Sequence, residues 1–179
     1  MRLFIAINFN GEIKNNLYDM IKRLKAHAVQ GSFTHSENLH LTLVFLGEVE
    51  SDKVGRIKQT MDKVTAEPFI LTMGGLGRFQ RGGGDIYWLG IERSETLLSI
   101  HNQLRKELVR EGFAIEKQEY KPHLTLGREI ILNQQFNQAE FCQSILAMKA
   151  EIGKISLMKS ERIKGKLIYT EIYGKKLGV

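Results

Sequence analysis

The sequence predicts an α+β fold in which a strand–helix–strand–helix–strand unit occurs twice. The tetrapeptide His-Leu-Thr-Leu stands at 40–43 and again at 123–126, which is 83 residues later in a chain of 179. Each copy alternates polar and apolar residues with the period of a strand. Amphipathic helical segments flank both copies in the same order. Ordinary composition gives an accidental repeat of this kind a chance of about 0.002, so the duplication indicates a function.

The first half of the chain follows the pattern of hydrophobic periods and helix-capping residues. In order, the expected elements are a strand at Leu3–Phe9, a helix over Gly11–His27 capped by Asn10, a short strand at Ser32–His35, a strand at His40–Leu46, a helix capped by Ser51 and ended by Pro68, and a strand at Phe69–Met73.

Six glycines between positions 74 and 84 predict a mobile loop, because their spacing fits neither a P-loop nor a dinucleotide-binding motif. The second half then repeats the order of the first. Its expected elements are a strand at Ile86–Ile91, a helix over Glu95–Glu111 capped by Ser94, an extended piece at Ile115–Lys117, the second His-Leu-Thr-Leu strand, a helix over Asn133–Ala147, and strands at Ile152–Met158 and Leu167–Tyr173. Aligning Phe4, Ala6 and Ile7 with Trp88, Gly90 and Ile91 gives an offset of 84.

Strand alternation sorts the residues of each tetrapeptide onto two faces. In the first copy, His40, Thr42 and Val44 are expected on one face, and the two leucines with Phe45 on the other. In the second copy the histidine and threonine again share a face. Two lobes related by a pseudo-twofold axis would bring the two His-Thr faces together across a cleft.

Two imidazoles and two hydroxyls suit phosphate chemistry. Histidine titrates near neutrality, so one imidazole can act as a general base and the other as a general acid. The hydroxyls of Thr42 and Thr125 can donate hydrogen bonds to the non-bridging oxygens of a phosphate. Between His40 and His123, the preferred assignment is His123 as base and His40 as acid.

Arg128 breaks the symmetry between the copies. It follows His123 by five residues, whereas Phe45 follows His40 by five. A guanidinium at this position can hold a phosphate and the charge that develops on it. Phe45 is expected to be a core residue, and stacking on a base is the less favoured alternative.

These motifs resemble those of the 2H phosphoesterases, specifically the RNA 2′,3′-cyclic phosphodiesterases historically called 2′-5′ RNA ligases. The resemblance covers nearly the whole chain and is most specific in the paired motifs. The matching segments, which include these motifs, are Met1–Ile7, Glu37–Leu43 with Phe45–Gly47, Gly74–Gly77, Trp88–Gly90, Pro122–Arg128 and Ser156–Glu161. The chain departs from the family where Phe33-Thr34-His35-Ser36 replaces Trp-Val-x-Pro, and where Val44 replaces a frequent basic residue.

The resemblance implies one bilobal domain over residues 1–179, with antiparallel sheets around a central cleft and helices on the outside. It implies hydrolysis of a 2′,3′-cyclic phosphate to a 2′-phosphate without a metal or other cofactor, with weak 2′-5′ ligase activity in reverse. By this resemblance His40 and His123 are catalytic residues, and Thr42, Thr125 and Arg128 bind the substrate phosphate.

Two other functions compete with this one. A non-catalytic RNA- or nucleotide-binding module could keep the same fold, although binding alone does not require two titrating groups. A metal-dependent phosphoesterase could use the two histidines as ligands, but no H-x-H motif or Asp/Glu cluster accompanies either copy.

Composition narrows the partners and the compartment. The net charge of +6 and the pI of about 9.4 favour RNA or nucleotides as partners. A single cysteine excludes a disulfide framework and a cysteine-based zinc site. The apolar run at the amino terminus is too short for a signal peptide, and no segment is long enough to span a membrane. A cytoplasmic monomer with no obligatory protein partner is therefore expected.

Overall fold

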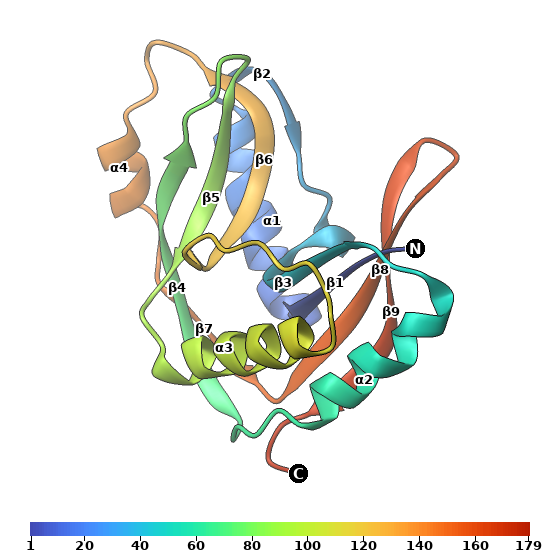
Figure 1. Ribbon diagram of the computed structural model, residues 1–179. Coiled ribbons are helices and arrows are strands. Elements are labelled where there is room, and N and C mark those ends of the chain that lie inside the picture. Colours follow the sequence, from blue (N-terminus) through green and yellow to red (C-terminus); the bar gives the residue numbers. More distant parts are fainter.

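Two antiparallel sheets make up most of the computed structural model, which describes all residues from 1 to 179 (Figure 1). The first sheet has the strand order β3-β1-β8-β9, and the second has the order β2-β6-β5-β4-β7. The strands of the first sheet are β1 (Arg2–Asn8), β3 (His40–Glu48), β8 (Lys154–Ile163) and β9 (Lys166–Lys176). Those of the second sheet are β2 (Ala28–Phe33), β4 (Phe69–Phe79), β5 (Asp85–Ile91), β6 (His123–Leu132) and β7 (Met148–Ile152).

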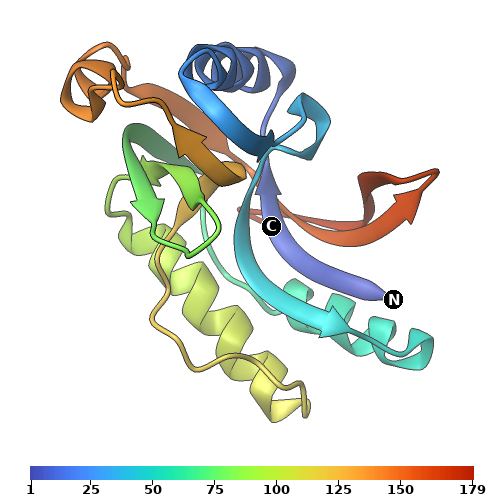
Figure 2. The ribbon, with the colours of Figure 1, turned by 90° about the horizontal axis from the view of Figure 1, so that it is seen from above.

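Four helices cover the sheets from opposite sides. They are α1 (Gly11–Lys25), α2 (Val54–Asp62), α3 (Glu95–Arg110) and α4 (Gln138–Gln143), and two 3₁₀ turns lie at Ser36–Asn38 and Ser51–Lys53. Helices α1 and α4 pack on strands of the second sheet, whereas α2 and α3 pack on strands of the first. Figure 2 shows these two pairs of helices on opposite sides of the molecule. The predicted α+β class, with antiparallel sheets and outer helices, is confirmed.

Two of the predicted helix N-caps are confirmed by their hydrogen bonds. Asn10 accepts a hydrogen bond from the backbone N–H of Ile13 at 3.0 Å, and the Ser94 hydroxyl accepts one from Leu97 at 3.2 Å, as predicted. Two other capping predictions were wrong. Ser51 begins the 3₁₀ turn before α2 and makes no capping bond. Helix α4 is capped by Asn137, so the predicted start at Asn133 lies four residues too early.

The glycine-rich segment is mostly strand, which corrects the prediction of a mobile loop. Strand β4 continues through Gly74, Gly75 and Gly77 to Phe79, and only residues 80–84 turn. The indole ring of Trp88 on β5 lies against Gly77, where an added Cβ would come within 2.1 Å of the ring. Glycine is needed there for the close approach of an aromatic ring.

The smaller strand predictions shift by a few residues. Strand β2 begins at Ala28 and not at Ser32, and residues 115–117 form no strand. The predicted strand Ile152–Met158 is divided at Gly153 between β7 and β8.

The two halves exchange strands, so neither sheet comes from one half alone. Strand β4 belongs to the first half but pairs with β5 in the second sheet. Strand β8 belongs to the second half but pairs with β1 in the first sheet. The register also corrects the internal alignment: Ala6 lies opposite Thr42 and Trp88 opposite Thr125, so equivalent residues are 82 apart and not 84.

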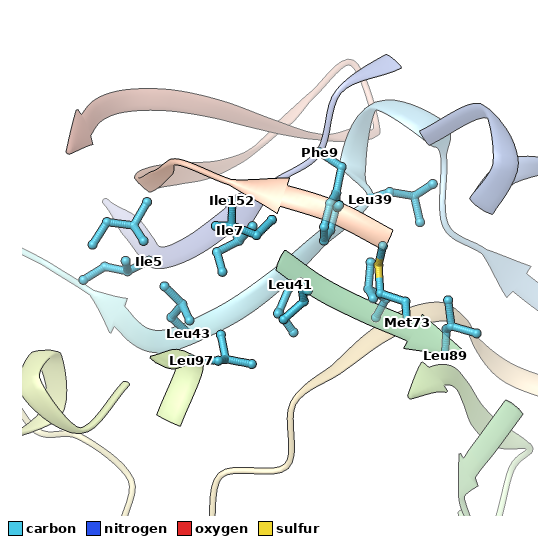
Figure 3. Packing of buried hydrophobic residues seen from close by; sticks show 14 of the residues in the cluster. Ile5, Ile7, Phe9, Leu39, Leu41, Leu43, Met73, Leu89, Leu97 and Ile152 are labelled. Atoms are coloured by element: carbon cyan, nitrogen blue, oxygen red, sulfur yellow. The ribbon is translucent and has the colours of Figure 1, made fainter. Parts of the chain in front are cut away.

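One continuous hydrophobic core joins the two sheets. Buried side chains from β1, β3, β4, β5, β6 and the helices belong to a single cluster, and Figure 3 shows Ile7, Leu41 and Met73 within it. A separate small cluster of Phe4, Ala6 and Met158 lies on the opposite face of the first sheet. None of the helices has both the length and the apolar character that a membrane crossing requires.

Candidate active site

Matching β-bulges lie in the two strands that carry the tetrapeptides. Along β3, Thr42 pairs with Ala6 and Val44 pairs with Ile5, which leaves Leu43 as an extra residue. Along β6, Leu126 is the extra residue in the same place relative to its motif, between Thr125 and Gly127. A bulge inserts one residue into one strand and therefore reverses the alternation of faces beyond it.

The bulges decide where the residue five places after each histidine points. Without a bulge, an odd separation would place that residue on the face opposite the histidine. In β3 the bulge buries Val44 and leaves Phe45 45% exposed. The prediction that Val44 shares the face of His40 and that Phe45 lies in the core was therefore wrong. In β6 it buries Gly127 and turns Arg128 outward, to the side of His123 and Thr125.

The ring of His40 is held in one orientation. Its Nδ1 lies 2.6 Å from the carbonyl oxygen of Asn38, and its Nε2 lies 3.0 Å from the hydroxyl of Thr42. A carbonyl can only accept a hydrogen bond, so Nδ1 carries the proton and donates it. The rings of Phe4 and Tyr169 flank the imidazole at centroid distances of 4.8 Å and 5.1 Å.

His123 repeats this arrangement on the other strand. Its Nδ1 lies 2.6 Å from the carbonyl oxygen of Lys121, again two residues earlier in the chain. The rings of Phe79 and Trp88 flank it at 5.1 Å and 6.0 Å. Nε2 is therefore the nitrogen that can take up or release a proton in both histidines.

Charges from both sheets act on His40. Burial is the main cause that lowers the pKa of His40, and the hydrogen bond to Asn38 opposes it. The positive charges of Lys14, Arg128 and His123 lower this pKa further. Strands β3 and β6 also pack against each other. The structure therefore brings the side chains of Arg128 and His123 near His40.

The lowered pKa favours a neutral His40 in the free protein at neutral pH. A neutral imidazole is the form of a general base, whereas the preferred assignment from sequence gave that role to His123. Which histidine is the base and which the acid stays a prediction. No group of three or more His, Cys, Asp or Glu side chains is arranged to hold a metal ion.

Two side-chain hydroxyl groups donate hydrogen bonds that link each motif strand to the segment before the other motif. We call these two hydrogen bonds the latch. The hydroxyl of Tyr120, just before the second motif, donates to the carbonyl of Thr42 at 2.9 Å. The hydroxyl of Thr34, just before the first motif, donates to the carbonyl of Thr125 at 2.9 Å. Each motif strand is thus held by the segment that leads into the other one, which fixes how the two motifs sit relative to each other.

His101 supports the same latch from helix α3. Its Nδ1–H donates to the carbonyl of the bulge residue Leu43 at 2.8 Å. Its ring stacks on Tyr120 with centroids 4.0 Å apart and planes at 4°. Burial raises the pKa of Tyr120, so its hydroxyl stays protonated and can donate. Sequence reasoning missed these residues, because nothing local links position 101 or 120 to positions 42 and 43.

Tyr120→Phe should weaken both stability and turnover. The part-buried carbonyl of Thr42 would lose its donor, which costs about 1 kcal/mol of unfolding free energy. Because Thr42 and His40 lie on the loosened strand, kcat should fall by up to about tenfold. Thermal midpoints and kcat measure the two effects. Tyr18→Phe on helix α1 is the matched control, since that hydroxyl makes no hydrogen bond and is exposed. A stability loss with unchanged kcat would limit Tyr120 to a structural role.

Two antiparallel sheets carrying paired His-x-Thr strands define a phosphoesterase of the 2H type. A family model described as the 2'-5' RNA ligase superfamily matches residues 13–164. An RNA 2′,3′-cyclic phosphodiesterase of Thermotoga maritima is 37% identical over 131 residues, covering 72% of this chain and 70% of that protein. One of Methanothermobacter thermautotrophicus is 30% identical over 178 residues and 96% of both chains.

Solved structures agree with the sequence relatives. Escherichia coli LigT complexed with 3′-AMP has a TM-score of 0.83 and 26% identity, with coverage of 99% of this chain and 98% of that one. TT0787 of Thermus thermophilus shares the fold with a TM-score of 0.84, at 20% identity and coverage of 98% and 97%. The chain belongs to the 2′-5′ RNA ligase superfamily and is an enzyme.

Proposed function

We propose that this enzyme hydrolyses the 2′,3′-cyclic phosphate of an RNA end or a nucleoside to a 2′-phosphate. The observation that carries the proposal is the matched pair of imidazoles. His40 and His123 each bind a backbone carbonyl through Nδ1, so Nε2 is the nitrogen that exchanges a proton in both rings. Only a reaction that needs one base and one acid gives both groups a task.

The reaction balances with these two groups. One imidazole takes a proton from water through Nε2 as the water oxygen attacks phosphorus. The bond between phosphorus and O3′ breaks, and the other imidazole, protonated at the start, gives its proton to O3′. The products are a 2′-phosphate and a 3′-hydroxyl, and each histidine ends in the protonation state in which the other began.

The remaining residues of the site hold the phosphate. The hydroxyls of Thr42 and Thr125 donate hydrogen bonds to the two non-bridging oxygens, and Arg128 balances the charge that grows on them. The 3.0 Å contact between Thr42 and His40 supports this, because it places a donor beside the titrating nitrogen. A 5′-hydroxyl in the place of water would give a 2′-5′ bond by the same proton transfers, which is the weak ligase activity.

The comparisons support the choice of substrate. Relatives from Thermotoga maritima and Methanothermobacter thermautotrophicus carry the name RNA 2′,3′-cyclic phosphodiesterase. Escherichia coli LigT was crystallised with 3′-AMP, which is a nucleoside monophosphate. The net charge of +6 suits a polyanionic substrate.

Incubation with a nucleoside 2′,3′-cyclic phosphate in excess chelator should yield the 2′-phosphate at an undiminished rate. Protonated histidine and Arg128 supply the positive charge that a metal would otherwise supply. Phosphorus NMR or chromatography against both isomers identifies the product. Loss of activity in chelator and recovery with a divalent cation would make the enzyme metal-dependent. Tight binding without any turnover would instead point to a nucleotide-binding module.

A further inference from the structure

An aromatic and basic surface extends from His40 along the first sheet. The ring of Phe4 lies 4.8 Å from His40, and Phe45 lies opposite Phe4 in the neighbouring strand. The guanidinium of Arg2 lies 5.1 Å from the centroid of the Phe45 ring. The bulge at Leu43 turns Phe45 to this face, as the bulge at Leu126 turns Arg128. We call Phe45 and Arg2 together the Phe45–Arg2 platform.

The guanidinium of Arg2 contacts the Phe45 ring but pairs with no carboxylate. Arg2 forms no ion pair, although Glu48 lies opposite it in the strand register. Glu48 instead lies 3.5 Å from the amino-terminal ammonium group. Arg2 also opposes the rise in the pKa of Tyr169 that burial causes, so its charge reaches the aromatic ring beside His40.

The surroundings of the platform favour an anionic ligand. The adjacent β8–β9 hairpin, which extends beyond the rest of the first sheet in Figure 1, carries four basic residues and one acidic residue. These residues belong to the tip of the hairpin, 159–166, and are Lys159, Arg162, Lys164, Lys166 and Glu161. An exposed ring with a free guanidinium above it, continuous with a phosphate site, is suited to stacking a nucleic-acid base.

We propose that the Phe45–Arg2 platform is a second nucleotide site, which binds the nucleotide that precedes the terminal cyclic phosphate of a single-stranded RNA. This inference rests on the proposed function. Thr42 pairs with Ala6 and Phe45 with Phe4, so Phe45 lies two residues of β1 further along the sheet, or roughly 7 Å, which is beyond the reacting phosphate. The base stacks on the face of the Phe45 ring that Arg2 does not cover, and the guanidinium of Arg2 contacts the phosphate that links the last two nucleotides.

The site makes the enzyme prefer an RNA end over a mononucleotide. Contacts remote from the reacting phosphate are made equally in the ground state and the transition state, so they lower KM and leave kcat almost unchanged. A dinucleotide that ends in a cyclic phosphate should therefore have a lower KM than the matching cyclic mononucleotide, with similar kcat.

The test compares these two substrates with wild type, Phe45→Ala, Phe45→Leu and Arg2→Gln. Phe45→Ala should raise KM for the dinucleotide about tenfold, in line with the loss of one base–aromatic stack. KM for the mononucleotide should stay unchanged. Phe45→Leu should recover only part of the loss, because leucine keeps apolar area without an aromatic face. Arg2→Gln should also act on the dinucleotide alone.

Two variants on outer helices serve as matched controls. Val109→Ala removes an apolar side chain that is 52% exposed on α3, and Arg56→Gln removes one positive charge from α2. Neither should change the ratio of KM values for the two substrates. Thermal midpoints for all variants identify any unfolding. If Phe45→Ala is unstable, the KM values of Phe45→Leu for the two substrates are compared with those of wild type instead.

Several results would overturn the second site. Equal effects of Phe45→Ala on both substrates would place the ring at the terminal nucleotide. Full recovery with leucine would exclude stacking, and equal KM values of wild type for both substrates would exclude the site itself. In contrast, no turnover of either substrate by wild type would refute the proposed function, and the two failures are therefore distinguishable.

Discussion

Alanine at His40 or at His123 should each lower kcat by roughly 10²–10⁴-fold, because each substitution removes one of the two proton transfers. The variants should still fold, since both side chains are only partly buried and neither belongs to the hydrophobic core. Measurements of kcat on a cyclic mononucleotide, with thermal midpoints alongside, separate the two effects. Near-wild-type turnover in either variant would contradict the mechanism.

The double variant extends this prediction. If the two imidazoles act in one concerted reaction, His40→Ala with His123→Ala should lose much less than the product of the single losses. His35→Ala is the control, since His35 is exposed and lies only five residues before His40. Its activity should remain that of wild type. Strictly multiplicative losses would mean that the two histidines serve independent steps.

The elements of the fold were largely predictable because their signals are local. The side chains of Asn10 and Ser94 cap the helices that follow them, and strand alternation found both motif strands. Exchange of β4 and β8 between the sheets could not be read from the same signals. A strand pattern shows that a segment is extended and which face is apolar, but not which neighbour it pairs with.

The site was predictable in its residues but not in its geometry. The tetrapeptides identified His40 and His123, yet the bulges at Leu43 and Leu126 have no mark in the sequence. A bulge is fixed by the pairing of two distant strands, so period-two reasoning assigned Phe45 to the core. The latch from Tyr120 to the carbonyl of Thr42 also joins positions that only the fold brings together.

Arg128→Ala should cost about 2–4 kcal/mol of transition-state stabilisation, the range for loss of a donor to developing negative charge. The bulge at Leu126 places Arg128 on the face of His123, and its charge reaches both His40 and Tyr169. Arg128→Lys should recover only part of the loss, because lysine keeps the charge but not the planar fork that binds two oxygens. The measurement is kcat/KM for wild type, Lys and Ala on one cyclic nucleotide.

A titration of His40 gives this prediction a second readout. Arg128 is one of the charges that lower the pKa of His40, and its removal stabilises the imidazolium. The pKa of His40, followed by NMR of the imidazole protons, should therefore rise in Arg128→Ala and stay low in Arg128→Lys. Arg128 is exposed at a bulged position of β6, so the thermal midpoint should not change. Full activity with an unshifted His40 would make Arg128 a surface residue, whereas a large drop in thermal midpoint would assign it to the fold and not to the phosphate.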